Sequence, residues 1–410
     1  MTDETNRLAP VARPAGARPR PSTRPGRATR VGLAPGLILA LAAVTGAPAR
    51  ASGEAEVPEA LAPYFRPPAE FAHDLGPYKS PLSFNNTLPV RSANDWRERR
   101  REILEAWHEA MGPWPPLIER PEMQVLEERP RDGFTQRRVR LKVAPDRTTD
   151  GYLLVPDGPG PFPAMLVVYY EPETAIGQGK GPGLRDFAYQ LARRGVAALS
   201  IGIEPRDIDP ARSGIKLQPL SYLAYVAANG YNALASLPEI DPARVGVMGH
   251  SYGGKWALFA SCLYEKFACG VWSDPGIVFD ESRPDVNYWE PWYLGWEPGR
   301  TRKRGVITPE SPRTGAYKRL VEAGHDLHEL HALMAPRPFL VSGGSEDPPK
   351  RWRALNHAIA VNTLLGRVDR VAMTNRPGHS PTAESNEQIY RFLEHVLKPE
   401  RAVQGRKGAP

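Results

Sequence analysis

Short apolar runs rich in β-branched residues alternate with segments of helical periodicity from about residue 134 onward. This alternation predicts an α/β fold, in which a mainly parallel sheet carries helices on both faces. The runs that we interpret as strands are TQRRVRLKV, DGYLLVP, PAMLVVYY, VAALSIGI, RVGVMGH, ACGVWSD, RPFLVSGG and RVAMTNR. The sequence therefore predicts an eight-stranded domain over residues 134–398, with one insertion, residues 277–330, between the sixth and seventh strands.

The segments that flank this domain differ from it in composition. Residues 52–133 begin with a Pro-rich stretch and continue into a helical segment, and we interpret them as an N-terminal extension. The last residues, 399–410, are predicted to form a flexible tail.

Residues 1–51 have the features of a signal peptide. They combine an Arg-rich start, an apolar stretch and an Ala-x-Ala pattern that ends at Ala51. An uncleaved anchor is the alternative, but Pro35 and Pro48 interrupt the apolar stretch and disfavour a membrane span. We therefore expect a secreted or periplasmic protein that has no stable membrane span after processing.

The same leader carries most of the net charge. The chain has a formal charge of +7, but eight arginines lie within the first fifty residues, against only Asp3 and Glu4. Little net charge is left for the folded domain, so the composition does not indicate a nucleic-acid partner.

A short motif in the middle of the chain carries the strongest chemical signal. In GHSYGGKWALF, the residues Gly249, Ser251 and Gly253 match G-x-S-x-G, after a predicted strand and before a predicted helix. Such a tight turn exposes the serine hydroxyl, and the new helix directs its positive end and the Tyr252 amide at a developing oxyanion. We predict that Ser251 is a nucleophile, a chemistry that needs no cofactor.

A serine nucleophile needs a base, and the base needs an acid that orients it. The sequence places His379 directly after the last predicted strand, where a base is expected. Two positions compete for the acid: Asp274 follows the sixth predicted strand, and Glu346 and Asp347 follow the seventh. The residues alone leave this choice open.

This constellation resembles the α/β-hydrolase superfamily in motif type and order. Several stretches are similar to the glucuronoyl esterases, which cleave esters between lignin alcohols and glucuronic acid on xylan. HDLHELHALMAPRPFLV resembles the D-x-H-E-L-x-A-L-x-A-P-R-P segment of that family. The residues that fit its G-C-S-R-x-G-K-x-A motif are Gly249, Ser251, Gly254, Lys255 and Ala257. Acetyl xylan esterases and the catalytic domains of prolyl oligopeptidases share some of these features.

The resemblance implies Ser251 as nucleophile, His379 as base, and either Asp274 or the Glu346/Asp347 pair as acid. In some family members the acid follows the sixth strand, which is the position of Asp274 in this chain.

The resemblance also bears on how the site holds its substrate. It implies that Lys255 is a ligand of the sugar, although a solvated lysine is the alternative. Tyr252 stands where the family has an arginine that contributes to the oxyanion hole, so only its backbone amide is expected to donate. The second donor is expected at Tyr170 or Glu171, after the third predicted strand, and the resemblance to prolyl oligopeptidases implies that the Tyr170 hydroxyl could take this role.

Three tryptophans lie close together in the insertion: Trp289, Trp292 and Trp296. Their rings could stack on sugars, because each offers a rigid apolar face. Packing inside a cap is the alternative.

Other potential ligands do not indicate a metal. His325, His328 and His331 recur every three residues, so their ring positions drift around a helix too fast to form one site. The two cysteines, Cys262 and Cys269, are expected to be buried thiols rather than a disulfide or a metal framework.

The sequence thus predicts an exported serine carboxylic-ester hydrolase that acts through an acyl-enzyme on a carbohydrate or uronate ester. One alternative is a serine peptidase of the prolyl oligopeptidase type, although residues 52–133 are too few to build a propeller. A non-catalytic binding module on a hydrolase scaffold is the other.

Overall fold

The computed structural model describes residues 56–179, 183–210 and 214–398. The predicted signal peptide and the predicted tail lie outside these described residues. No helix within the described ranges is long and apolar enough to cross a membrane.

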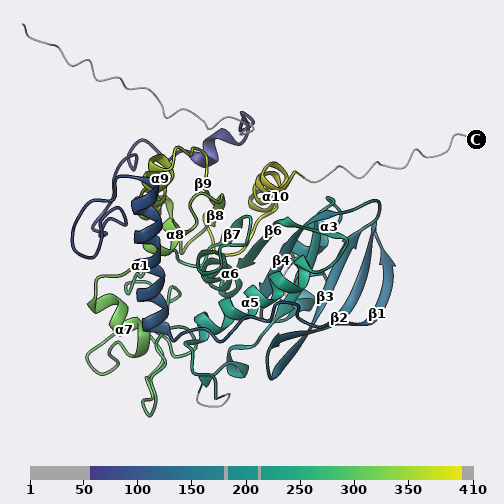
Figure 1. The fold of residues 1–410 in the computed structure, drawn as a ribbon, viewed down its shortest axis with the longest axis horizontal. Helices are drawn as coiled ribbons and strands as arrows, with labels where there is room; N and C mark the ends of the chain where they lie inside the picture. Colours follow the sequence, from purple (N-terminus) through teal and green to yellow (C-terminus); the bar gives the residue numbers. More distant parts are fainter. Residues whose placement is uncertain (1–55, 180–182, 211–213, 399–410) are drawn as a thin grey trace, which may run out of the picture. The chain divides into compact units, whose positions relative to one another are not determined.

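Nine strands form one sheet in the order β1-β2-β3-β5-β4-β6-β7-β8-β9 (Figure 1). The strands β1, β2, β3 and β5 pair antiparallel in turn, and every pair from β5 through β4 to β9 is parallel. Their bounds are β1 Met123–Arg131, β2 Phe134–Ala144, β3 Arg147–Pro156, β4 Phe162–Tyr169, β5 Ala197–Gly202, β6 Ile240–His250, β7 Gly270–Ser273, β8 Phe339–Gly343 and β9 Val371–Asn375.

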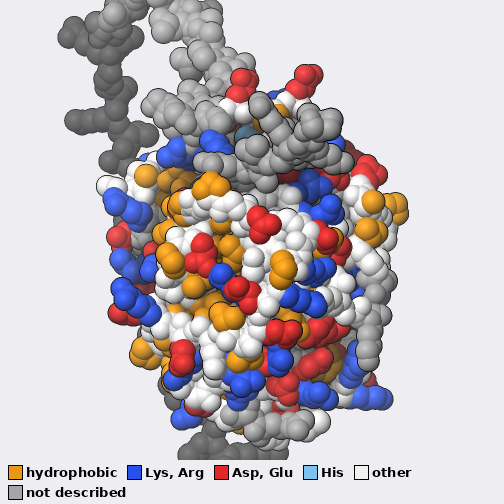
Figure 2. Space-filling view, turned by 90° about the vertical axis from the view of Figure 1, so that its right-hand side faces the viewer, with side chains coloured by type: hydrophobic (Ala, Val, Ile, Leu, Met, Phe, Trp, Pro, Cys, Tyr) orange, Lys and Arg blue, Asp and Glu red, His pale blue; other side chains and the backbone are white. Residues whose placement is uncertain are grey.

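The predicted fold class is confirmed, but the predicted strand number is wrong. The additional strand is β1, which lies at the edge of the sheet and before residue 134. Its sequence, MQVLEERPR, has no buried position, so it lacks the buried apolar residues that mark the other strands. Charged residues and a proline are common on edge strands because they discourage pairing with another chain. Basic and acidic side chains are interspersed on the face near β1 and β2 (Figure 2).

Helices cover both faces of the sheet. The helices are α1 Ala93–Met111, α2 Pro172–Ala175, α3 Phe187–Ala192, α5 Pro219–Ala235, α6 Tyr252–Leu263, α7 Gly315–Glu322, α8 His328–Leu333, α9 Trp352–Leu364 and α10 Ala383–Leu397. Short 3₁₀ helices lie at Ala62–Phe65, Pro205–Asp207 and Pro349–Arg351. One apolar core contains side chains of α1, α5, α6, α8 and α9, and a second contains side chains of α3 and α10.

Strand β4 shows why the sheet has two cores. Leu166 and Val168 lie in the first core, whereas Met165 and Val167 lie in the second. Successive side chains of a strand point to opposite faces, so a strand that is apolar throughout is buried on both.

The segment before residue 134 belongs to the same core. In α1, whose first turn is capped by the Ser92 side chain, the buried residues recur every three or four positions and form one face. They are Trp96, Arg99, Ile103, Trp107 and Met111. The predicted N-terminal extension therefore supplies one helix of the first core as well as strand β1.

Candidate active site

The predicted nucleophile lies in a sharp turn between β6 and α6. Ser251 has φ 58° and ψ −113°, a conformation that is costly for a residue with a side chain. The glycines around it allow the close packing of this turn. A Cβ at Gly249 would overlap the backbone of Gly253, and a Cβ at Gly253 would overlap the carbonyl oxygen of Val168. This close approach is the physical reason for the G-x-S-x-G pattern.

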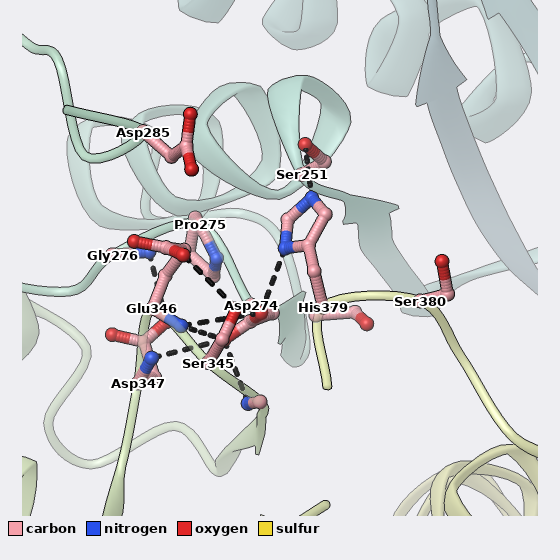
Figure 3. Close-up of polar contacts among 12 residues, drawn as sticks. Ser251, Asp274, Pro275, Gly276, Asp285, Ser345, Glu346, Asp347, His379 and Ser380 are labelled. Atoms are coloured by element: carbon pink, nitrogen blue, oxygen red, sulfur yellow. Dashed lines mark hydrogen bonds and ion pairs between the residues drawn. The ribbon is translucent and has the colours of Figure 1, made fainter. Parts of the chain in front are cut away.

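Three side chains converge at the carboxyl ends of the parallel strands (Figure 3). Ser251 Oγ lies 2.8 Å from His379 Nε2, and His379 Nδ1 lies 2.7 Å from Asp274 Oδ2. These residues follow β6, β9 and β7, which end at the same edge of the sheet. The Asp274 side chain is fully buried, whereas that of His379 is 37% exposed. Such an arrangement can remove the proton from a serine hydroxyl and stabilise the resulting imidazolium.

The Asp274 carboxylate is held in place by the loop after β8. Its Oδ1 accepts hydrogen bonds from the backbone N–H groups of Gly344, Glu346 and Asp347, at 2.6, 3.1 and 2.9 Å. These donors fix the carboxylate so that the other oxygen, Oδ2, faces His379.

The competing acids lie elsewhere in the same loop. Asp347 accepts hydrogen bonds from the backbone N–H groups of Gly276 at 2.8 Å and Ile277 at 2.6 Å, so it holds the turn that follows Asp274. Burial raises the pKa of Asp347 to about 6, and the charge of Asp274 adds to this effect. Glu346 forms an ion pair with Arg283 at 3.3 Å. Of the acids that the sequence left open, the structure brings Asp274 to the imidazole.

Sequence reasoning missed a residue that fixes the loop of His379. Arg376 donates from Nη2 to the carbonyl oxygen of His379 at 2.6 Å and from Nε to that of Ser380 at 2.9 Å. Its Nη1 donates to the Ser342 carbonyl oxygen on β8 at 2.8 Å. Arg376 therefore ties the loop to the sheet, and no motif in the sequence marks this role.

One of the expected oxyanion donors, Tyr252, directly follows the nucleophile. Tyr252 is the first residue of α6, and its backbone amide lies where a helix leaves N–H groups without intrahelical partners. Its ring stacks on that of Tyr170, with centroids 4.4 Å apart, and its hydroxyl donates to the Ile203 carbonyl oxygen. Burial raises the pKa of Tyr170 to about 12, so its hydroxyl keeps its proton at neutral pH. Donation by Tyr252, Tyr170 or Glu171 to an oxyanion stays a prediction.

The Lys255 side chain is buried and contacts other groups of the protein. It is 3% exposed, and its Nζ donates to the carbonyl oxygens of Pro275 and Asp285. The same Nζ lies 4.6 Å from the centroid of the Tyr288 ring. The alternative of a solvated lysine is wrong. Because Pro275 directly follows Asp274, these contacts support the turn of the acid, and a contact with a sugar stays a prediction.

The structure separates the three tryptophans of the insertion. Trp289 is fully buried, and its Nε1 donates to the Gly305 carbonyl oxygen at 2.8 Å, so it has no ring face to offer a sugar and that prediction is wrong. Trp292 is half-buried beneath the guanidinium of Arg304, and Trp296 is half-buried as well. Stacking of Trp292 on a sugar stays a prediction.

The histidines between α7 and β8 each face a different partner. His325 Nδ1 contacts Glu329, His328 Nε2 contacts the carbonyl oxygen of Lys79, and the His331 ring packs on Trp272. Within the described ranges, no group of three or more His, Cys, Asp or Glu side chains could hold a metal ion.

Cys262 and Cys269 are buried and unpaired, which confirms the prediction of buried thiols. Burial raises the pKa of Cys269 to about 12, so this thiol is not ionised at neutral pH.

A cavity of about 770 Å³ lies away from this site. Its walls include Trp96, Glu265 and Arg337. Glu265 precedes β7 and Arg337 precedes β8, so the cavity lies at the opposite edge of the parallel strands from Ser251. It therefore has no part in the chemistry of the triad.

Comparisons with known proteins agree with this geometry. Residues 227–364, which include Ser251 and Asp274, match the model of the prolyl oligopeptidase family. A glucuronoyl esterase from Solibacter usitatus has a similar structure, with a TM-score of 0.61 at 19% identity over 79% of this chain and 99% of that one. The chain has the α/β-hydrolase fold.

Two further solved structures share this fold. A CE15 glucuronoyl esterase from Teredinibacter turnerae has a TM-score of 0.59 at 19% identity, over 78% of this chain and 89% of that one. A putative acetyl xylan esterase from Bacteroides fragilis has a TM-score of 0.53 at 16% identity, over 75% and 80%. A search of curated protein sequences found no match. The family match and the structural neighbours support a serine hydrolase, as the sequence predicted.

Proposed function

We propose that the protein is a serine carboxylic-ester hydrolase that works through an acyl-enzyme. Ser251 attacks the ester carbonyl while His379 accepts its proton and then donates it to the leaving alcohol. Water, activated by the same imidazole, releases the acid product, and Asp274 orients the ring throughout. The continuous contact from Ser251 through His379 to Asp274, at 2.8 and 2.7 Å, carries this proposal.

The substrate that we propose is a carbohydrate or uronate ester. The structural neighbours named as glucuronoyl esterases and as a putative acetyl xylan esterase support this class. The motif residues shared with glucuronoyl esterases and the half-buried Trp292 on the insertion support it as well.

A peptidase is the second candidate, because the matching family model is that of the prolyl oligopeptidases. The described residues before the sheet form one 3₁₀ helix and α1, with no propeller to restrict access to the site.

A substrate panel separates the candidates. The purified protein would be assayed with p-nitrophenyl acetate, benzyl glucuronate and a Pro-p-nitroanilide, with Ser251→Ala as the control. We expect Ser251-dependent hydrolysis of the two esters and none of the anilide. Cleavage of the anilide alone would establish a peptidase, and no turnover of any substrate would favour a binding module.

Export is a separate part of the proposal, supported by the Ala-x-Ala pattern that ends at Ala51. Protein from the native host should begin near Ser52. An N-terminus at Met1 or Thr2 would contradict cleavage.

A further inference from the structure

A second imidazole lies against the ring of the base. His250 is the last residue of β6 and directly precedes Ser251, and it is 2% exposed. Its ring centroid lies 4.8 Å from that of His379, and the two ring planes are inclined by 40°. The proposed mechanism gives this buried ring no role. His250 and Tyr252 are the positions at which this chain departs from the G-C-S-R-x-G-K-x-A motif of the glucuronoyl esterases.

The polar edge of His250 connects the strands that carry the triad. His250 Nδ1 lies 3.1 Å from the hydroxyl of Ser273, the residue before Asp274. The same hydroxyl accepts a hydrogen bond from Arg376 Nη2 at 3.3 Å. Arg376 Nη2 also donates to the carbonyl oxygen of His379. The residues that precede the nucleophile and the acid are thus joined to the loop of the base.

Burial and the charges around His250 keep its ring neutral. Burial holds the pKa of His250 well below its usual range, and the nearby His379, Arg376 and Arg185 lower it further. A hydrogen bond with the backbone of Ser273 acts in the other direction and raises the pKa. The carboxylate at this site, Asp274, faces His379 rather than His250. His250 therefore stays neutral beside the base.

We propose that His250 is a positioning residue that acts through His379: its neutral ring packs on the base and stabilises the imidazolium that forms when Ser251 loses its proton. An aromatic ring within about 6 Å of a cation attracts it through its face. The Ser273 contact holds the ring in the orientation that makes this possible. The proposal rests on the use of His379 as the base in ester hydrolysis.

Variants at position 250 separate the ring from its polar edge. His250→Phe keeps a ring against His379 and loses the contact with Ser273. His250→Asn keeps a polar group near Ser273 and removes the ring, and His250→Leu removes both. The measurement is the pH profile of kcat/KM for p-nitrophenyl acetate, whose acid limb reports protonation of the base in the free enzyme.

We expect the acid limb to keep its position in His250→Phe and to move down by about half a pH unit in His250→Asn and His250→Leu. The shift is downward because the imidazolium loses a stabilising partner. Thermal unfolding shows which variants are folded, and two ring-free variants keep the test open if one of them is not. An acid limb that stays in place in the ring-free variants, or moves equally in all three, would overturn the proposal.

NMR titration of the His379 ring in the same proteins gives a readout that needs no substrate. The same pattern of shifts is expected there. The NMR titration does not depend on catalysis. It therefore tests the role of His250 even if Ser251→Ala retains activity and the proposed hydrolysis fails.

Discussion

Replacement of Asp274 by asparagine tests how the base is oriented. Three backbone N–H groups, from Gly344, Glu346 and Asp347, point at Oδ1 of Asp274. In Asp274→Asn the amide oxygen must take this place, because the amide nitrogen cannot accept these hydrogen bonds. The new NH₂ group then faces His379 Nδ1, where Oδ2 was.

The consequence is a histidine with its proton on the wrong nitrogen. His379 Nδ1 must accept from the new NH₂ group, so the proton moves to Nε2, which lies 2.8 Å from Ser251 Oγ. A protonated Nε2 cannot take the proton of the serine. We expect a loss of about 10⁴-fold in kcat, as for loss of an orienting aspartate in other serine triads.

The assay is steady-state hydrolysis of p-nitrophenyl acetate, with circular dichroism and thermal unfolding to show that the variant is folded. Glu346→Gln is the matched control, because the Glu346 carboxylate faces Arg283 and not His379. The kcat of this variant should stay within about threefold of the wild-type value. Asp347→Asn should mainly lower stability, by about 1–3 kcal/mol, because one of the Gly276 and Ile277 amides loses its acceptor. The assignment of Asp274 as the acid would be refuted if Asp274→Asn kept a kcat near that of wild type while Glu346→Gln or Asp347→Asn lost about a hundredfold in kcat.

Three further predictions concern the scaffold of the site. Burial lowers the pKa of Lys255 from 10.5 to about 8. Between these two pH values the unfolded chain binds more protons than the folded protein, so the contribution of Lys255 to the free energy of unfolding rises with pH. Relative to Lys255→Met, wild type should therefore gain roughly 2 kcal/mol of unfolding free energy from about pH 7 to about pH 9.5, in chemical denaturation; a constant difference would contradict the burial of a charged amine. Gly253→Ala should lose soluble, folded protein because its Cβ would overlap Val168, and normal yield with an unchanged melting temperature would contradict the tight turn. Cys262 and Cys269 should react with a thiol reagent only after denaturation, and rapid labelling of the native protein would contradict their burial.

The fold class could be predicted because the buried strands of a parallel sheet are continuous apolar runs. Strand β1 could not, because an exposed edge strand buries no face and its sequence resembles a polar loop. Trp289 and Trp292 looked equivalent in the sequence, since burial inside an insertion depends on contacts with distant residues such as Tyr317.

Some residues of the active site could also be predicted from the sequence, and others could not. Ser251 could be predicted because a nucleophile of this kind needs a strand-to-helix turn with glycines. His379 could be predicted because it follows the last strand. The choice among the acids could not be made, since the turns after β7 and β8 meet at one edge and each carboxylate binds the backbone of the other turn. Arg376 carries no local pattern, and the one signal for His250 was its departure from the cysteine of the glucuronoyl esterase motif.

The most direct test of the account is the mass of the protein during turnover. Wild type and Ser251→Ala would be mixed with excess p-nitrophenyl acetate, quenched in acid and measured by intact-mass and peptide mass spectrometry. The account predicts one acetyl group on the Ser251 peptide of wild type, none in the variant, and a loss of ~10³-fold or more in kcat for Ser251→Ala. A variant that keeps kcat within about tenfold of wild type, or an acetyl group on another residue that turns over, would contradict the assignment of Ser251 as the nucleophile.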